Sequence, residues 1–155
     1  MKLFAAAFAV VGLLASDAEA GEDKVLLQDG SYEVKVRLQI PNVWNWAADK
    51  TATICVRNGA VDDAPFAVLS GNNPLANCPA RNVRRNGANL SFDILCEGRD
   101  AARARAVYTL MLHDFVGRIA MVMGGKNMTM TEVQVGHRVG DCGLAEASGA
   151  ARQAR

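Results

Sequence analysis

The stretch that decides the fold is Tyr32-Glu33-Val34-Lys35-Val36-Arg37-Leu38-Gln39-Ile40. Apolar and polar side chains alternate along it, so one face carries only apolar residues: Tyr32, Val34, Val36, Leu38 and Ile40. A period of two is that of a β-strand with one buried and one solvated face. Gly30 before the stretch and Pro41 after it delimit the strand.

Six more segments have the composition or alternation of short strands, at residues 51–56, 82–85, 89–96, 104–112, 115–123 and 128–139. Asn86-Gly87 lies between two of them, and both residues accept the positive φ of a type I′ hairpin turn. Helical periodicity is almost absent. We therefore predict an all-β protein, a single antiparallel meander that closes into a small barrel or half-barrel.

The first 20 residues have the features of a Sec signal peptide. Lys2 supplies the positive charge, an apolar stretch follows from 3 to 15, and Ala18-Glu19-Ala20 is a small-x-small cleavage site. The apolar stretch is shorter than the roughly 20 residues of a transmembrane helix. We expect cleavage after Ala20, a periplasmic protein without a transmembrane segment, a β domain at 21–143 and a flexible tail at 144–155.

The mature chain is nearly neutral. Removal of 20 from 155 residues leaves 135, one domain's worth, with 16 Lys and Arg against 14 Asp and Glu. Six arginines around the central hairpins form a candidate basic patch: Arg81, Arg84, Arg85, Arg99, Arg103 and Arg105. No aromatic stacking pattern accompanies them, so we expect no nucleic-acid partner.

Four cysteines lie in the exported part: Cys55, Cys78, Cys96 and Cys142. An even number in an oxidising compartment indicates two disulfides, and the spacing fits no zinc site. Of the three connectivities we favour Cys55–Cys78 with Cys96–Cys142. The first would close the irregular region 57–80, in which we expect a helical turn near 65–69, and the second would tie the C-terminus to a central strand.

The order of several short motifs resembles that of a bacterial family known as domain of unknown function 3617. The matching motifs are Gly30-Ser31-Tyr32-Glu33-Val34, the cysteines at 55, 78 and 96, Asn86-x-x-Asn89 and Gly140-Asp141-Cys142. The resemblance covers about residues 28–143 and implies an exported four-cysteine β protein. The loop Pro41–Trp46 departs from the Met- and Pro-rich loop often found there, and the family implies no activity or catalytic residues.

Four methionines are candidates for a metal site. With a turn at 124–127, Met123 would face Met128 and Met121 would face Met130, so the four thioethers would cluster. Thioethers suit Cu(I), but methionine also fills cores. Glu132 shares the parity of Met128 and Met130 whereas Val133, Val135 and Val139 do not, so we expect a bulge near Thr131 to keep both sets inside.

Catalytic motifs are absent from the sequence. There is no nucleophile elbow, no zinc-protease motif and no phosphate-binding loop. His113 precedes Asp114 in an expected turn, and His137 alternates with valines, so neither has a partner that sequence can identify. We predict that the protein is not an enzyme and that it has no cofactor.

Three binding modes stay open. The first is a non-catalytic periplasmic binding or accessory protein that holds a small apolar ligand in a barrel lined by Val36, Leu38, Phe92, Ile94, Tyr108 and Leu110. The second is docking on a larger envelope complex through Trp44, Trp46 and an edge strand. The third is the Cu(I) site of the methionines.

Overall fold

The structure, a computed structural model, describes residues 27–42, 49–57, 66–98, 101–125 and 128–143. The signal peptide expected at 1–20, the tail expected at 144–155, Arg99 and the two tryptophans lie outside these residues. None of the described helices is long and apolar enough to cross a membrane.

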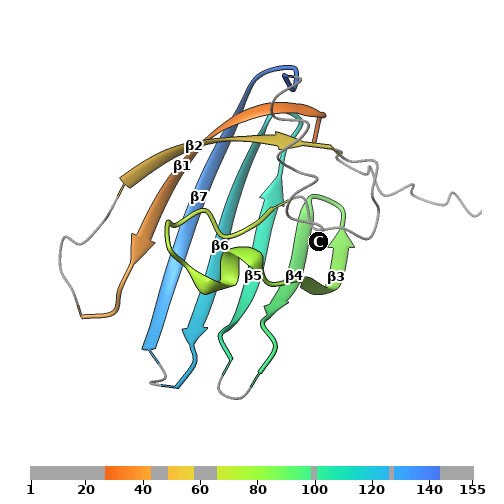
Figure 1. Cartoon of the computed structure of the whole chain (residues 1–155). Helices are drawn as coiled ribbons and strands as arrows, with labels where there is room; N and C mark the ends of the chain where they lie inside the picture. The colour runs from red at the N-terminus through yellow and green to blue at the C-terminus, as the bar shows by residue number, and fades with distance from the viewer. Residues whose placement is uncertain (1–26, 43–48, 58–65, 99–100, 126–127, 144–155) are drawn as a thin grey trace, which may run out of the picture.

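Seven antiparallel strands form one curved sheet (Figure 1). They are β1 Gly30–Gln39, β2 Asp49–Val56, β3 Ala80–Asn86, β4 Asn89–Leu95, β5 Arg103–Leu110, β6 Asp114–Met123 and β7 Met128–Gly140. Their order is β2-β1-β7-β6-β5-β4-β3, and the end strands β2 and β3 do not pair. The all-β expectation is confirmed, and the sheet is an open half-barrel.

The sheet differs from a simple meander in that the last strand, β7, pairs with the first strand, β1. β7 runs antiparallel to β1 over nine residue pairs, from Ser31↔Gly140 to Gln39↔Thr131. A register shift between Ser31 and Tyr32 is the only irregularity in this pairing. The C-terminal strand therefore lies beside the N-terminal hairpin, far from β4.

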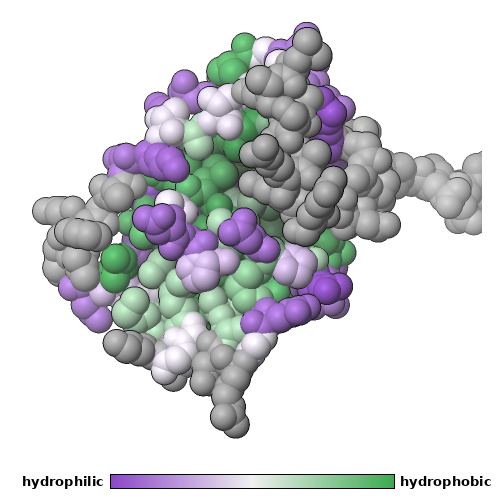
Figure 2. Space-filling model, viewed as in Figure 1, coloured by the Kyte–Doolittle hydropathy of each residue, from purple (hydrophilic) through white to green (hydrophobic). Residues whose placement is uncertain are grey.

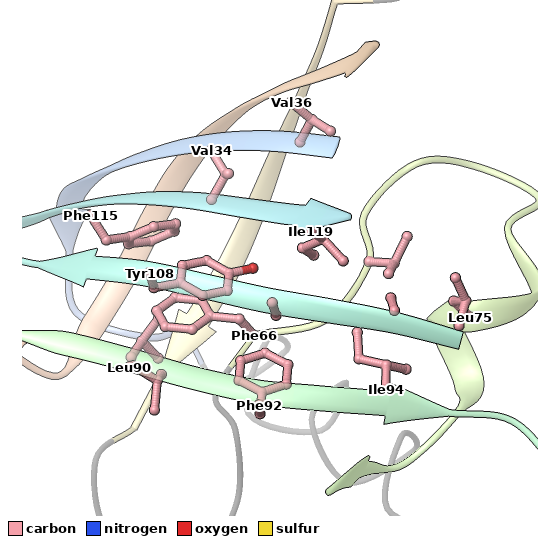
Figure 3. Packing of buried hydrophobic residues seen from close by; sticks show 14 of the residues in the cluster. Val34, Val36, Phe66, Leu75, Leu90, Phe92, Ile94, Tyr108, Phe115 and Ile119 are labelled. Atoms are coloured by element: carbon pink, nitrogen blue, oxygen red, sulfur yellow. The ribbon is translucent and has the colours of Figure 1, made fainter. Parts of the chain in front are cut away.

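A segment that we call the strap, residues 66–79, crosses the concave face of the sheet in front of β5, β6 and β7 (Figure 1). Phe66, Val68 and Leu75 of the strap are buried. The ring of Phe66 stacks on that of Tyr108 with centroids 4.2 Å apart (Figure 3). The strap thus supplies the second layer that buries one face of the sheet.

The expected helical turn near 65–69 is wrong for residues 66–69, which form no helix. A 3-10 helix, η1 Pro74–Asn77, lies further along the strap instead. Asn73 caps this helix, because its side-chain oxygen accepts a hydrogen bond from the backbone amide of Leu75. Pro74 suits the first turn, because the amide hydrogen that proline lacks would have no partner within the helix there. The two signals of that helix are local and stand in the sequence.

The expected disulfide pairing is also wrong. Cys55 bonds Cys142, and Cys78 bonds Cys96. Because β1 lies between β2 and β7, the first bond bridges the two neighbours of β1. The second joins the end of the strap to the end of β4. The first disulfide follows from the β1–β7 pairing, and the second continues the register of β3 and β4, in which Ala80 lies opposite Ile94.

No bulge is present near Thr131. The β6–β7 register runs without a shift from Met123↔Met128 to Asp114↔His137. Glu132 and Gln134 consequently face the core and are fully buried, whereas Val135 and Val139 lie on the outer face, 47% and 59% exposed. The even-numbered residues of β7, such as Met128 and Met130, therefore face the inner side of the sheet, and the odd-numbered valines face the outer side.

Candidate ligand-binding face

A buried polar network anchors the strap to the sheet. The carboxylate of Glu132 accepts hydrogen bonds from the backbone amides of Leu69 (2.8 Å) and Ser70 (2.9 Å). Gln134 donates to Glu132 (2.6 Å) and to the carbonyl of Ala67 (2.8 Å). Two residues of β7 therefore hold three residues of the strap, Ala67, Leu69 and Ser70.

Tyr108 completes this network from β5. Its hydroxyl donates to Oε1 of Gln134 at 2.9 Å. Burial raises the pKa of Tyr108 well above its ordinary value, and the charge of Glu132 raises it further. Among the described residues, every buried side-chain nitrogen or oxygen has a hydrogen-bond partner. The network is thus fully satisfied, as a buried polar group must be to avoid a cost of desolvation.

One edge of the strap runs across the sheet from β2 to β6, and side-chain contacts mark both of its ends. On the β2 side, Nζ of Lys50 donates to the carbonyl of Leu69 at 3.2 Å. Over β6, Nδ2 of Asn73 lies 3.2 Å from Sδ of Met121. Polar groups of the strap and of Lys50 therefore border the part of the concave face that the strap leaves uncovered.

We call that uncovered part the floor. It is formed where β1 and β6 end and β7 begins, by the inward-facing residues Leu38, Met121, Met123, Met128 and Met130. Met121 is buried at the edge of the strap, Met128 is 56% exposed, and the others are partly exposed. Figure 2 shows hydrophilic residues across the middle of this face and a hydrophobic area below them.

The expected methionine register is confirmed: Met121 pairs with Met130 and Met123 with Met128. Cross-strand neighbours lie about 5 Å apart at Cβ, within reach of thioether side chains. The described residues contain no group of three or more His, Cys, Asp or Glu that would suit a metal ion. A metal at the floor would therefore rest on thioethers.

The predicted ligand pocket is occupied by the strap. Five of its six lining residues are at most 2% exposed, namely Val36, Phe92, Ile94, Tyr108 and Leu110. Figure 3 shows how Phe66 of the strap packs against this set. Only Leu38 stays partly open, at the border of the floor. The centre of the half-barrel is a solid core.

His137 meets a carboxylate, which the sequence did not indicate. Its Nδ1 lies 2.6 Å from Oδ1 of Asp114, the cross-strand partner on β6. The pair stands on the outer face, with side chains 68% and 46% exposed. His113 is exposed in the turn before Asp114, as expected, and its carbonyl accepts the amide hydrogen of Arg138.

The candidate basic patch is partly neutralised. Arg105 pairs with Asp93 at 2.8 Å, and the carboxylate of Asp93 also accepts from Asn82. These contacts lower the pKa of Asp93 below its ordinary value, the bond to Arg105 having the larger effect. Arg81, Arg84 and Arg103 are exposed on β3 and β5. They form a solvated face of the sheet.

Sequence reasoning missed Lys50, Asn73 and Glu132 as residues of the candidate site. The parity of Glu132 with the methionines was a signal for its buried position. Nothing local in the sequence marks Lys50, because its inward position depends on the pairing Val36↔Lys50.

These features define a class of protein: a small, open β half-barrel with two disulfides and a strap across its concave face. Residues 27–142 match the family described as "Protein of unknown function (DUF3617)", and the chain belongs to that family. The comparison with curated proteins found no match, and neither did the comparison with solved structures.

Proposed function

We propose that this protein is a non-catalytic periplasmic binding or accessory protein, and that the floor holds a small apolar ligand. The observation that carries the proposal is the row of inward-facing apolar side chains that the strap leaves open. Met123, Met130 and Leu38 are partly exposed, whereas the next inward-facing residue of each strand toward the strap is buried, namely Met121, Glu132 and Val36. Ligand sites are mostly apolar and concave, with a few polar groups at the border.

Methionine suits such a site physically. Its unbranched, polarisable side chain adapts to ligands of different shape, and Met-rich surfaces occur in promiscuous binders. The rigid sheet holds the strands from which these side chains project. We infer that the floor selects ligands by apolar area more than by detailed shape.

Two observations support export and the absence of catalysis. The two disulfides need an oxidising compartment such as the periplasm, in agreement with the Sec signal expected at residues 1–20. The Asp114–His137 pair is solvent-exposed on the outer face of the sheet, on the opposite side from the floor. A general base acts on a substrate within hydrogen-bond reach, and a ligand on the floor would lie on the other face of the sheet from this pair.

Titration with an apolar fluorescent probe, N-phenyl-1-naphthylamine, tests the floor. The unreduced mature protein is expected to bind the probe, and Met123→Gln with Met130→Gln is expected to weaken binding at least about tenfold, because it places amides on the floor. Met111→Gln is the matched control, since Met111 is exposed beyond the end of β5 and outside the floor.

Native mass spectrometry of the protein purified from its own periplasm complements the titration. Retention of a ligand by the wild type and its loss from the floor variant would support the proposal. Circular dichroism establishes that the variant folds, and Leu38→Gln provides a second variant on β1. Equal probe binding by wild type and both folded variants would contradict the proposal.

The confirmed register of the four methionines favours a second candidate function, the binding of Cu(I). Met123→Leu with Met130→Leu removes two thioethers and keeps the floor apolar. A competition titration with the reduced metal is expected to show binding by the wild type and at least a tenfold loss in this variant. Equal affinity of both proteins for Cu(I), or no binding by the wild type, would contradict this function.

A further inference from the structure

Resting on the proposed function, we propose that the floor binds a single-chain amphiphile with a carboxylate head, and that Lys50 holds the head. Lys50 lies opposite Val36 and shares its inward face. It stands on edge strand β2 and is exposed, while its ammonium reaches the edge of the strap at Leu69. A cation therefore borders an otherwise apolar surface.

The charge of Lys50 has no carboxylate partner among the described residues. Its ammonium has three donors, of which the contact with the Leu69 carbonyl uses one. The neighbouring acid, Asp49, lies on the other face and pairs with Arg37 at 2.9 Å. Glu132 is fully buried and accepts from Leu69, Ser70 and Gln134. An anionic ligand head would pair with this ammonium.

The dimensions of the floor favour one extended hydrocarbon chain. Lys50 lies level with Val36 and Gln134, and Met130 lies two strands across and four residues further along β7, so about 10 Å across the strands and about 13 Å along them, roughly 16 Å in all, separate Lys50 from Met130. An alkyl chain of about twelve carbons covers that span. Along the strands the floor is two inward-facing positions deep, about 7 Å, which leaves width for one chain.

The two kinds of group are also segregated as an amphiphile requires. Lys50, Ser70 and Asn73 lie along the edge formed by the strap, and Asn73 touches Met121 at the far end. Leu38 and the methionines form the surface below. A head at Lys50 keeps its contact with water because Lys50 is exposed, while the chain loses its contact with water on the floor.

Calorimetric titration with dodecanoate and with 1-dodecanol tests this inference. The two ligands share the chain and differ in the charge of the head. Wild-type protein is expected to bind dodecanoate at least about tenfold more tightly at low ionic strength, because a hydrogen bond to a charged group is worth more than one to a neutral group. Lys50→Met is expected to abolish this preference and to leave the affinity for 1-dodecanol unchanged.

The matched control is Lys35→Met, which removes an exposed cation of the outer face and should leave both affinities unchanged. Equal affinity of the wild type for the two ligands would overturn the role of Lys50 and leave the proposed function standing. Failure to bind either ligand would count against the proposed function itself. A preference that persists in Lys50→Met would place the head elsewhere and overturn the assignment.

Discussion

Gly117 and Gly136 make room for aromatic rings of the core. Gly117 is the cross-strand partner of Tyr108, and a Cβ atom at position 117 would lie 2.1 Å from Cε1 of that ring. Gly136 pairs with Phe115 in the same way, with 2.2 Å to its Cε1. Each ring packs on the backbone of a glycine in the neighbouring strand and so lies close to the sheet. This position leaves room for Phe66 of the strap to contact both rings.

Gly117→Ala is therefore expected to displace the Tyr108 ring and to lower the free energy of unfolding by about 1–3 kcal/mol. Urea denaturation measures the change. Gly71→Ala is the control: a Cβ there meets nothing within 4 Å, so its effect should stay below about 1 kcal/mol. Equal effects of the two substitutions would contradict the packing described for Tyr108.

Tyr108 is expected to make the folded protein less stable at alkaline pH. Because burial raises its pKa above the ordinary 10.0, folded Tyr108 keeps its proton at pH values where the unfolded chain releases it. Its contribution to stability is fully present below about pH 10 and is lost as pH rises further, at up to about 1.4 kcal/mol per pH unit. Burial raises the pKa of Tyr32 too, with the same sign of effect.

Comparison with Tyr108→Phe isolates this residue. Near pH 8 the variant is expected to be less stable by about 1 kcal/mol, since the hydrogen bond to Gln134 is lost. Above about pH 10 the difference should shrink, because only the wild type pays for ionising Tyr108. Urea denaturation at both pH values measures the difference. A difference that stays constant would show that Tyr108 titrates normally.

At the scale of elements, β7 and the strap depend on each other. Glu132 and Gln134 would lack these partners in the core without the backbone groups of Ala67, Leu69 and Ser70. The strap, in turn, has no strand partner and is held by these bonds, by Phe66 and Leu75, and by the disulfide at Cys78. This mutual dependence explains why the inner face of β7 carries an acid and an amide, Glu132 and Gln134, where apolar residues would be expected.

The two disulfides are expected to act differently when removed. Cys55→Ala with Cys142→Ala opens a sequence separation of 87 and should cost about 4.5 kcal/mol, against about 3 kcal/mol for the separation of 18 between Cys78 and Cys96. Only the second pair fixes the strap, so only its removal should increase binding of an apolar dye under native conditions. Denaturation and dye fluorescence measure the two effects.

Peptide mapping without reduction checks the connectivity on which this prediction rests. Fragments that join Cys55 to Cys142 and Cys78 to Cys96 are expected. A fragment that joins Cys55 to Cys78 would contradict both the connectivity and the pairing of β1 with β7 that leads to it.

At the scale of the whole molecule, the sheet has two edges. β2 and β3 each pair on one side only. β3 is protected by three arginines and by an irregularity between Arg81 and Arg84, where Asn82 has φ 54°. β2 carries no register shift in its pairing with β1. Regular edges can take up a further strand, and irregular, charged ones resist it.

The docking hypothesis makes a prediction at this scale. Trp44→Ala with Trp46→Ala is expected to leave the fold intact and to abolish co-purification with a partner, because exposed aromatic residues contribute much of the energy of an interface. Circular dichroism and a pull-down from the periplasm measure the two properties. If the double variant unfolds, the tryptophans belong to the core and the hypothesis fails.

Local patterns predicted the strands well. All seven strands lie within a few residues of the expected positions, because alternation and the Asn86-Gly87 turn act over short distances. The methionine register was predictable for the same reason, since a tight turn determines which residues of a hairpin face each other. The candidate site was predictable only in part: its methionines and Leu38 were identified, whereas Lys50, Asn73 and Glu132 were not.

Local sequence patterns were sufficient to predict the class of the fold, the seven strands and the methionine pairs, because each of these depends on residues close together in the chain. The pairing of β1 with β7, the Cys55–Cys142 disulfide and the burial of Glu132 depend on tertiary contacts. The same holds for the path of the strap, which fills the pocket expected in the middle of the half-barrel. These features depend on contacts between residues far apart in sequence. Such contacts form only when the packing and hydrogen bonding of the whole chain favour them, so no local sequence pattern predicts them.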